Sequence, residues 1–87
     1  MERKKQKVRL AVNQALLSCN TDFRIKDELS SMNKLSVRFS PSKTAHQCMR
    51  TFCADYAESA AHLNLHTNDV RVEPLDKELT VKLTVLK

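Results

Sequence analysis

Residues 40–64 read SPSKTAHQCMRTFCADYAESAAHLN, and their pattern sets the centre of the fold. At about 100° per residue, the apolar side chains of this stretch fall within one arc of about 140° on a helical wheel, and polar residues face away. Ser40 and Pro41 are typical of a helix start, as N-cap and first helical position, and Asn64 is typical of a helix end. The stretch therefore predicts one long amphipathic helix as the spine of the domain. The apolar arc consists of Ala45, Cys48, Met49, Phe52, Cys53, Tyr56, Ala60 and Leu63.

In the residues before this helix, apolar side chains recur at every second position. Leu35, Val37 and Phe39 are separated by polar residues, which is the pattern of a strand buried on one face. Residues 23–29, FRIKDEL, alternate less regularly and predict a partner strand, although KDELSSM would also fit a helical turn. SSMN at residues 30–33 is typical of the turn that joins two such strands.

The residues after the helix, NDVRVEPLDKELTVKLTVLK at 68–87, predict a second hairpin. Val70 and Val72 lie in its first strand, residues 79–85 form its second, and EPLDK is the connecting turn. The threonine and valine content favours strand over helix. A competing helical spacing is formed by Leu75, Leu79, Leu83 and Leu86.

A shorter amphipathic helix is predicted from Val8 to Cys19, which completes the order helix-strand-strand-helix-strand-strand. This order favours an α+β fold, a small two-layer sandwich in which an antiparallel sheet carries two helices on one face. We expect residues 8–87 to form a single globular domain and residues 1–7 to be a basic N-terminal segment. If residues 75–87 were helical, the alternative would be a histone-like all-helical dimer.

The composition is that of a globular protein inside the cell. Of the 87 residues, 41% are hydrophobic and 29% are charged, and no apolar run is long enough to span a bilayer, so no membrane contact is expected. The three cysteines are an odd number without Cys-x-x-Cys spacing, which indicates reduced thiols in the nucleus or cytoplasm.

The positive charge is concentrated at the start of the chain. Residues 1–9 hold five basic residues and one acidic residue, so they carry +4 of the net charge of +5. Cations at a helix N-terminus oppose the helix dipole, so helix stability does not explain them. They fit contacts to nucleic-acid phosphates, a nuclear address at KKQK, or a solvated helix end. The five candidate residues are Arg3, Lys4, Lys5, Lys7 and Arg9.

The strand pattern predicts a second basic surface on the outer face of the sheet. It would consist of Arg24, Lys26, Arg38, Arg71 and Lys82, with serines and threonines between them. The four aromatic residues follow the apolar phases of their elements, so a base-stacking platform is not expected. From these two surfaces we expect a nucleic-acid-binding module, for DNA or RNA, that contacts the phosphate backbone with little sequence preference.

The alternative function is a protein–protein interaction subunit or adaptor of a larger complex. Leu10 and Leu17 lie seven residues apart on the polar side of the first helix and would contact the protein partner. A homodimer would form through an exposed edge strand at TVKLTVLK, residues 80–87. The basic N-terminus would then serve as a nuclear address or as a contact to an acidic partner.

No catalytic site is predicted. The chain has no glycine, which excludes a P-loop, a dinucleotide fingerprint and a GxxG clamp. Cys53 lies on the apolar arc, where burial would make it inert, and the three histidines complete no metal spacing. We therefore expect no enzyme activity, cofactor, metal or small-molecule substrate. Ser40 before Pro41 is a candidate phosphorylation site, whose phosphate would lie at the start of the central helix.

Overall fold

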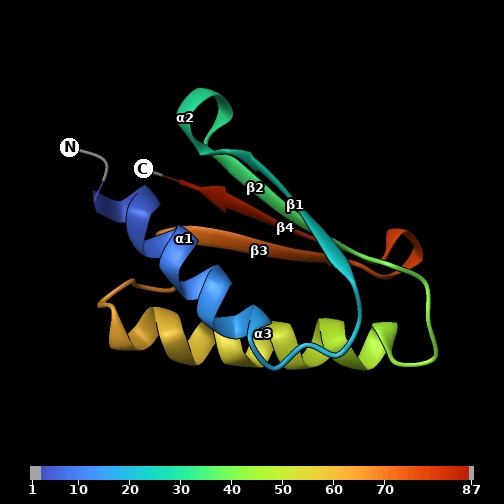
Figure 1. Cartoon of the computed structure of the whole chain (residues 1–87). Coiled ribbons are helices and arrows are strands. Elements are labelled where there is room, and N and C mark those ends of the chain that lie inside the picture. The colour runs from blue at the N-terminus through green and yellow to red at the C-terminus, as the bar shows by residue number, and fades with distance from the viewer. Residues whose placement is uncertain (1–2, 87) are drawn as a thin grey trace.

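The computed structural model describes residues 3–86, and it confirms the predicted α+β architecture and the order of its elements (Figure 1). The histone-like alternative is wrong, because the C-terminal residues form strands. The elements are α1 (Arg3–Leu16), β1 (Phe23–Glu28), α2 (Leu29–Met32), β2 (Lys34–Phe39), α3 (Ala45–His62), β3 (Val70–Leu75), the 3-10 turn η1 (Asp76–Glu78) and β4 (Thr80–Val85).

The four strands form one antiparallel sheet in the order β1-β2-β4-β3, and α1 and α3 cover the same face of it (Figure 1). The edges of the sheet are therefore β1 and β3. The prediction that TVKLTVLK is an edge strand is wrong. Val81, Leu83 and Val85 on β4 are almost fully buried, and a strand with such a side-chain row is best accommodated between two neighbours.

The core lies between the two helices and the inner face of the sheet. The predicted arc of α3 points inward, with Met49, Phe52 and Tyr56 each 4% exposed or less. A row of aromatic rings connects the two layers, since Phe39 packs on Phe23 and Phe52, and Phe52 packs on Tyr56, with centroid distances of 6.4, 6.0 and 6.3 Å. Each buried side chain of this size contributes about 1.5–3 kcal/mol to folding.

The start of α3 lies five residues later than Ser40. Its N-cap is Thr44, and its first residue is Ala45, so the prediction of Ser40 and Pro41 at the helix start is wrong. The Ser40 N–H donates to the Asp22 carbonyl at 2.8 Å and extends the β1–β2 ladder instead. The chain needs residues 41–44 to cross from the sheet layer to the helix layer, which a sequence pattern does not show.

Within residues 3–86, three residues take the left-handed conformation, each at the end of an element: Asn33 (φ 58°), Asn64 (φ 63°) and Leu79 (φ 50°). The last residue of α3 is His62, two residues before the predicted end at Asn64, which lies just beyond the C-cap Leu63. The Asn64 N–H donates to the Ala61 carbonyl and the Leu65 N–H to the Ala60 carbonyl, at 3.1 and 2.9 Å. These two bonds form a Schellman motif, in which asparagine takes the place that glycine usually holds.

Both hairpin connections differ from the predicted turns. Residues 29–32 form the single turn α2, the alternative that KDELSSM allowed, because the Leu29 side chain is fully buried and anchors it. The second connection lies at residues 76–79 and not at EPLDK, because β3 continues to Leu75. Pro74 is tolerated inside β3 because this strand lies at a sheet edge.

The first helix begins at Arg3, so residues 3–7 of the predicted basic segment are helical, and residues 1–2 lie outside the described residues. Val8, the first apolar residue of α1, is fully buried against the core. Within residues 3–86, no helix has the length and apolar character needed to cross a membrane.

Candidate nucleic-acid interface

The outer face of the sheet, which neither helix covers, gathers all five cations predicted for it. Successive side chains of a strand point to opposite faces, so the residues between the buried positions of each strand share this surface. Lys34 joins them, at the start of β2. We call this set the basic sheet face; its cations are Arg24, Lys26, Lys34, Arg38, Arg71 and Lys82.

Two glutamates, Glu28 and Glu73, are the acidic residues on the same face, so its strands carry an excess of four positive charges. Lys26 approaches Glu28 only at 3.9 Å, and Glu73 lies opposite Lys82 in the ladder. Exposed pairs of this kind contribute little to stability and leave the face positive.

The most unusual feature of the basic sheet face is the pairing of two arginines. Arg24 on β1 lies directly opposite Arg38 on β2. The Ser40 N–H donates to the Asp22 carbonyl, so Ser40 and Asp22 are a hydrogen-bonded pair of the ladder. Hydrogen-bonded and non-bonded pairs alternate, so Arg24 and Arg38, two residues further along, are also a hydrogen-bonded pair, with Cα atoms about 5.5 Å apart. Like charges in this position destabilise a sheet. Among residues 3–86, no carboxylate forms an ion pair with either guanidinium.

A polar hollow of about 280 Å³ lies beside the arginine pair, at the end of β2. Arg24, Arg38, Ser40 and Pro41 line it together with Phe39. Two guanidinium groups and a serine hydroxyl provide several hydrogen-bond donors, which is the chemistry that recognises phosphate oxygens. Ser40 is exposed here and does not lie at the start of α3, so a phosphate on Ser40 would meet the two arginines and not the helix N-terminus.

The N-terminal cations occupy a different surface. They lie on α1, on the helix side of the sheet (Figure 1). Lys4 and Arg9 form ion pairs within the fold. Lys4 Nζ lies 3.3 Å from Asp69 Oδ1, and Arg9 Nε lies 2.7 Å from Asp27 Oδ2. Lys5 and Lys7 are half-buried and Arg3 is exposed. The structure thus does not bring the N-terminal cations and the basic sheet face together.

These two ion pairs perturb the carboxyl groups. The hydrogen bond from Arg9, the largest cause, lowers the pKa of Asp27. The pKa of Asp69 is lowered by the backbone N–H of His66 and by Lys4. Both aspartates stay ionised at neutral pH and hold their cations in place. Lys4 and Arg9 are therefore less available for phosphate than the sequence indicated.

The two leucines predicted to contact a protein partner are both exposed: Leu10 is 51% exposed on α1, and Leu17, in the turn that follows, is 84% exposed. Phe23 and Ile25 on β1 are also exposed, by 37% and 39%, although their side chains point to the helix side of the sheet. In the sequence both residues follow the apolar phase of the predicted strand. The low regularity of residues 23–29 was the one signal that this strand lies at an edge.

The Cys53 thiol lies on α3, in the predicted apolar arc, and is partly buried. Burial, and then the charge of Asp76, raise the pKa of the Cys53 thiol, so it is a poor nucleophile at neutral pH. In the described part of the chain, no group of three or more His, Cys, Asp or Glu side chains is placed to hold a metal ion.

Comparison with protein-family models, with curated proteins and with solved structures finds no significant match to this chain.

Proposed function

We propose that the chain is a non-enzymatic module that binds the phosphate backbone of DNA or RNA on its basic sheet face, in the nucleus or cytoplasm. The observation that carries the proposal is the Arg24–Arg38 pair beside the polar hollow. The pair is unfavourable for the isolated sheet, and a bound phosphate would neutralise it.

The mode of binding follows from the side chains on the face. The aromatic rings of Phe23, Phe39, Phe52 and Tyr56 lie on the helix side of the sheet, so the face offers cations and hydroxyls but no stacking surface. Contacts to phosphate fix position without reading bases. The proposal is therefore for binding with little sequence preference and with strong dependence on salt.

The test is a salt series of binding to a 20-base-pair duplex of arbitrary sequence, followed by fluorescence anisotropy. The double variant Arg24→Gln/Arg38→Gln removes two phosphate contacts, so the slope of log K against log salt should become shallower by about 1.8. The control is Arg50→Gln, which removes one exposed cation from α3 on the opposite layer and should leave the slope unchanged.

A second arm separates the two basic surfaces. The variant Arg3→Gln/Lys5→Gln/Lys7→Gln changes α1 and leaves the basic sheet face intact. A large loss of affinity in this variant, together with unchanged binding by the arginine double variant, would place the contact on α1 and overturn the proposal for the sheet face.

The alternative, a protein-interaction subunit, is supported by the exposure of Leu10, Leu17, Phe23 and Ile25. This function predicts that the chain does not bind the duplex even at low salt. The same titration at about 20 mM salt therefore decides between the two functions, since cation-driven binding is strongest there.

A further inference from the structure

The edge strand β3 has backbone groups that are free to pair. The Leu86 N–H donates to the Asp69 carbonyl at 2.8 Å, which fixes the phase of the β3–β4 ladder. Because hydrogen-bonded and non-bonded pairs alternate, Arg71, Glu73 and Leu75 bond to β4. The backbone groups of the residues between them therefore point to the open edge; these residues are Val70, Val72 and Pro74.

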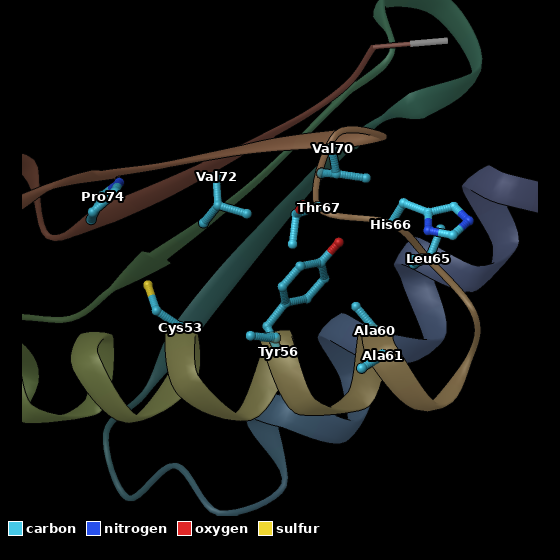
Figure 2. A pocket seen from close by; sticks show the side chains of 11 residues that line it. Cys53, Tyr56, Ala60, Ala61, Leu65, His66, Thr67, Val70, Val72 and Pro74 are labelled. Carbon is cyan, nitrogen blue, oxygen red and sulfur yellow. The ribbon is translucent and has the colours of Figure 1, made fainter.

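An apolar groove of about 470 Å³ accompanies this edge on its helix side, between β3 and α3 (Figure 2). The side chains of Val70, Val72 and Pro74 form one wall, and Ala57 and Ala60 of α3 contribute to the other. An open apolar groove beside an unpaired edge is the kind of surface that soluble proteins usually cover.

Tyr56 gives a second sign that the groove is incomplete. Its side chain is 4% exposed, and its ring points from α3 into the space below Thr67 and Val70 (Figure 2). The Tyr56 hydroxyl is buried and has no hydrogen-bond partner in the described part of the chain. Buried hydroxyl groups are usually hydrogen-bonded, so the unbonded Tyr56 hydroxyl marks incomplete polar packing at the wall of the groove.

We propose that a second copy of this chain covers the edge, by antiparallel pairing of β3 with β3 about a two-fold axis at Val72. The two sheets would become one sheet of eight strands, with the helices of both copies on the same side. This inference does not depend on the proposed nucleic-acid binding.

The backbone of β3 suits this register. Val72 would exchange two hydrogen bonds with Val72 of the second copy, because its N–H and C=O both point to the open edge. Val70 would lie opposite Pro74 of the second copy, where the Val70 N–H can donate to the proline carbonyl. Proline lacks an N–H, so it loses only the return bond. Four intermolecular hydrogen bonds result, two from each copy.

The charges on β3 select the same register. With Val72 on the axis, Arg71 of each copy lies directly opposite Glu73 of the other, on the outer face of the combined sheet. Opposite charges in this position are favourable. The neighbouring two-fold registers move the axis to Arg71 or to Glu73, so they place two arginines or two glutamates against each other.

The two-fold arrangement also limits the size of the assembly. It uses the same edge on both copies, so it closes at two chains and leaves each β1 edge free. Pairing of β3 with the β1 edge of another copy would instead be head-to-tail and would continue into polymers. Small side chains at Ala57, Ala60 and Ala61 on α3 allow the second copy to approach the groove closely.

The test is sedimentation equilibrium of the full chain between about 1 and 300 μM, with charge reversals as probes. The wild type should reach twice the chain mass of 10.0 kDa. Arg71→Glu and Glu73→Arg should each raise the dimer dissociation constant at least tenfold, because each places like charges opposite each other. The double variant Arg71→Glu/Glu73→Arg should return the constant to within about threefold of wild type, since both pairs re-form with reversed sign.

The matched control is Lys43→Glu, an identical reversal at an exposed position between β2 and α3, which should leave the dissociation constant unchanged. Circular dichroism of each variant separates loss of pairing from loss of folding. A wild type that stays monomeric at 300 μM, a double variant that fails to recover, or polymers larger than two chains would each overturn the proposal.

A cross-link gives an independent check of the register. In a chain with Cys19, Cys48 and Cys53 replaced by alanine, Val72→Cys should form a disulfide between two copies under mild oxidation. The Cα atoms of a hydrogen-bonded antiparallel pair are about 5.5 Å apart, which lies in the range a disulfide spans. In the proposed register position 70 lies opposite Pro74 of the second copy, so two copies of the Val70→Cys variant do not bring their new thiols together. This variant should cross-link at least tenfold more slowly, and equal rates would contradict the register.

Discussion

Asp27 is the residue at which the first helix is joined to the edge of the sheet. Its carboxylate accepts hydrogen bonds from Arg9 Nε at 2.7 Å, from Arg9 Nη2 at 3.4 Å and from the Leu29 N–H at 3.0 Å. One side chain thereby connects α1, β1 and the start of α2. An aspartate on the inner side of an edge strand is tolerated because β1 is only partly covered.

Asp27→Asn should lower stability at neutral pH and have little effect in acid. The folded pKa of Asp27 is lowered, so its contribution is present above the unfolded value of about 3.8 and is lost as pH falls through the folded pKa. Both side chains are more than a third exposed, so the loss should be about 0.2–1 kcal/mol at pH 7. Asparagine keeps the acceptor for the Leu29 N–H. Urea denaturation at pH 7 and pH 2.5 measures both values; an equal loss at the two pH values would contradict the charge mechanism.

The ion-pair partners of individual charged residues could not be predicted from the sequence. The cations at the start of the chain oppose the helix dipole, so helix stability does not explain them, and that argument about α1 still holds. What it missed is that Lys4 and Arg9 meet aspartates 65 and 18 residues away. Such distant pairs depend on how the elements pack, which no local pattern contains.

At the scale of an element, the start of α3 is held by a cluster of hydroxyl groups. The Thr21 hydroxyl, on a residue only 6% exposed, lies 2.7 Å from the Thr44 hydroxyl and 3.1 Å from that of Ser42, and the Cys48 thiol donates to it at 3.3 Å. This cluster connects the loop before β1 to the first turn of α3.

Thr21→Val should therefore destabilise the protein by about 1–3 kcal/mol, because the substitution keeps the shape and removes a buried hydroxyl from its partners. Ser40→Ala should change stability by less than about 0.5 kcal/mol, because Ser40 is exposed and uses only its backbone N–H, which alanine retains. Thermal melts of the two variants make the comparison. If Ser40→Ala were the more damaging change, the assignment of the helix start to Thr44 would be in error.

The elements themselves were largely predictable, because the spacing of the apolar residues within each element follows the period of a helix or of a strand. The arc of α3 and the alternation of Leu35, Val37 and Phe39 identify both the element and its buried face. The cations of the basic sheet face follow from the same alternation. The α3 boundary was not predictable, since Ser40 and Pro41 satisfy the rules for a helix start while the chain uses them to leave the sheet.

At the scale of the whole molecule, the N-terminal residues matter through the helix they extend. Deleting residues 1–7 removes the first turns of α1 and the Lys4–Asp69 pair but retains the buried residues from Val8 onward. We expect the fold to persist with about 1 kcal/mol less stability, equivalent to a melting temperature lower by about 4–8 °C for a chain of this size. Far-ultraviolet circular dichroism during heating tests this; loss of the folded signal at 20 °C would mean that residues 3–7 are essential to the core.

The order of the strands could not be predicted from the sequence. Two hairpins were expected, but their patterns do not specify which strands meet between them. The structure joins them through β2 and β4, and this junction decides that β1 and β3 are the open edges. The exposure of Phe23 and Ile25 and the open edge of β3 are consequences of that junction.

Tyr56 has a practical consequence, because it is the single tyrosine of a chain without tryptophan. Absorbance at 295 nm in alkaline solution therefore reports one phenol, without any label. Burial raises the pKa of Tyr56 from 10 to about 12, so the ionised ring is disfavoured in the native state. Stability from this group is complete below pH 10 and is lost as pH rises through about 12, and a spectrophotometric titration thus reads the integrity of the groove directly.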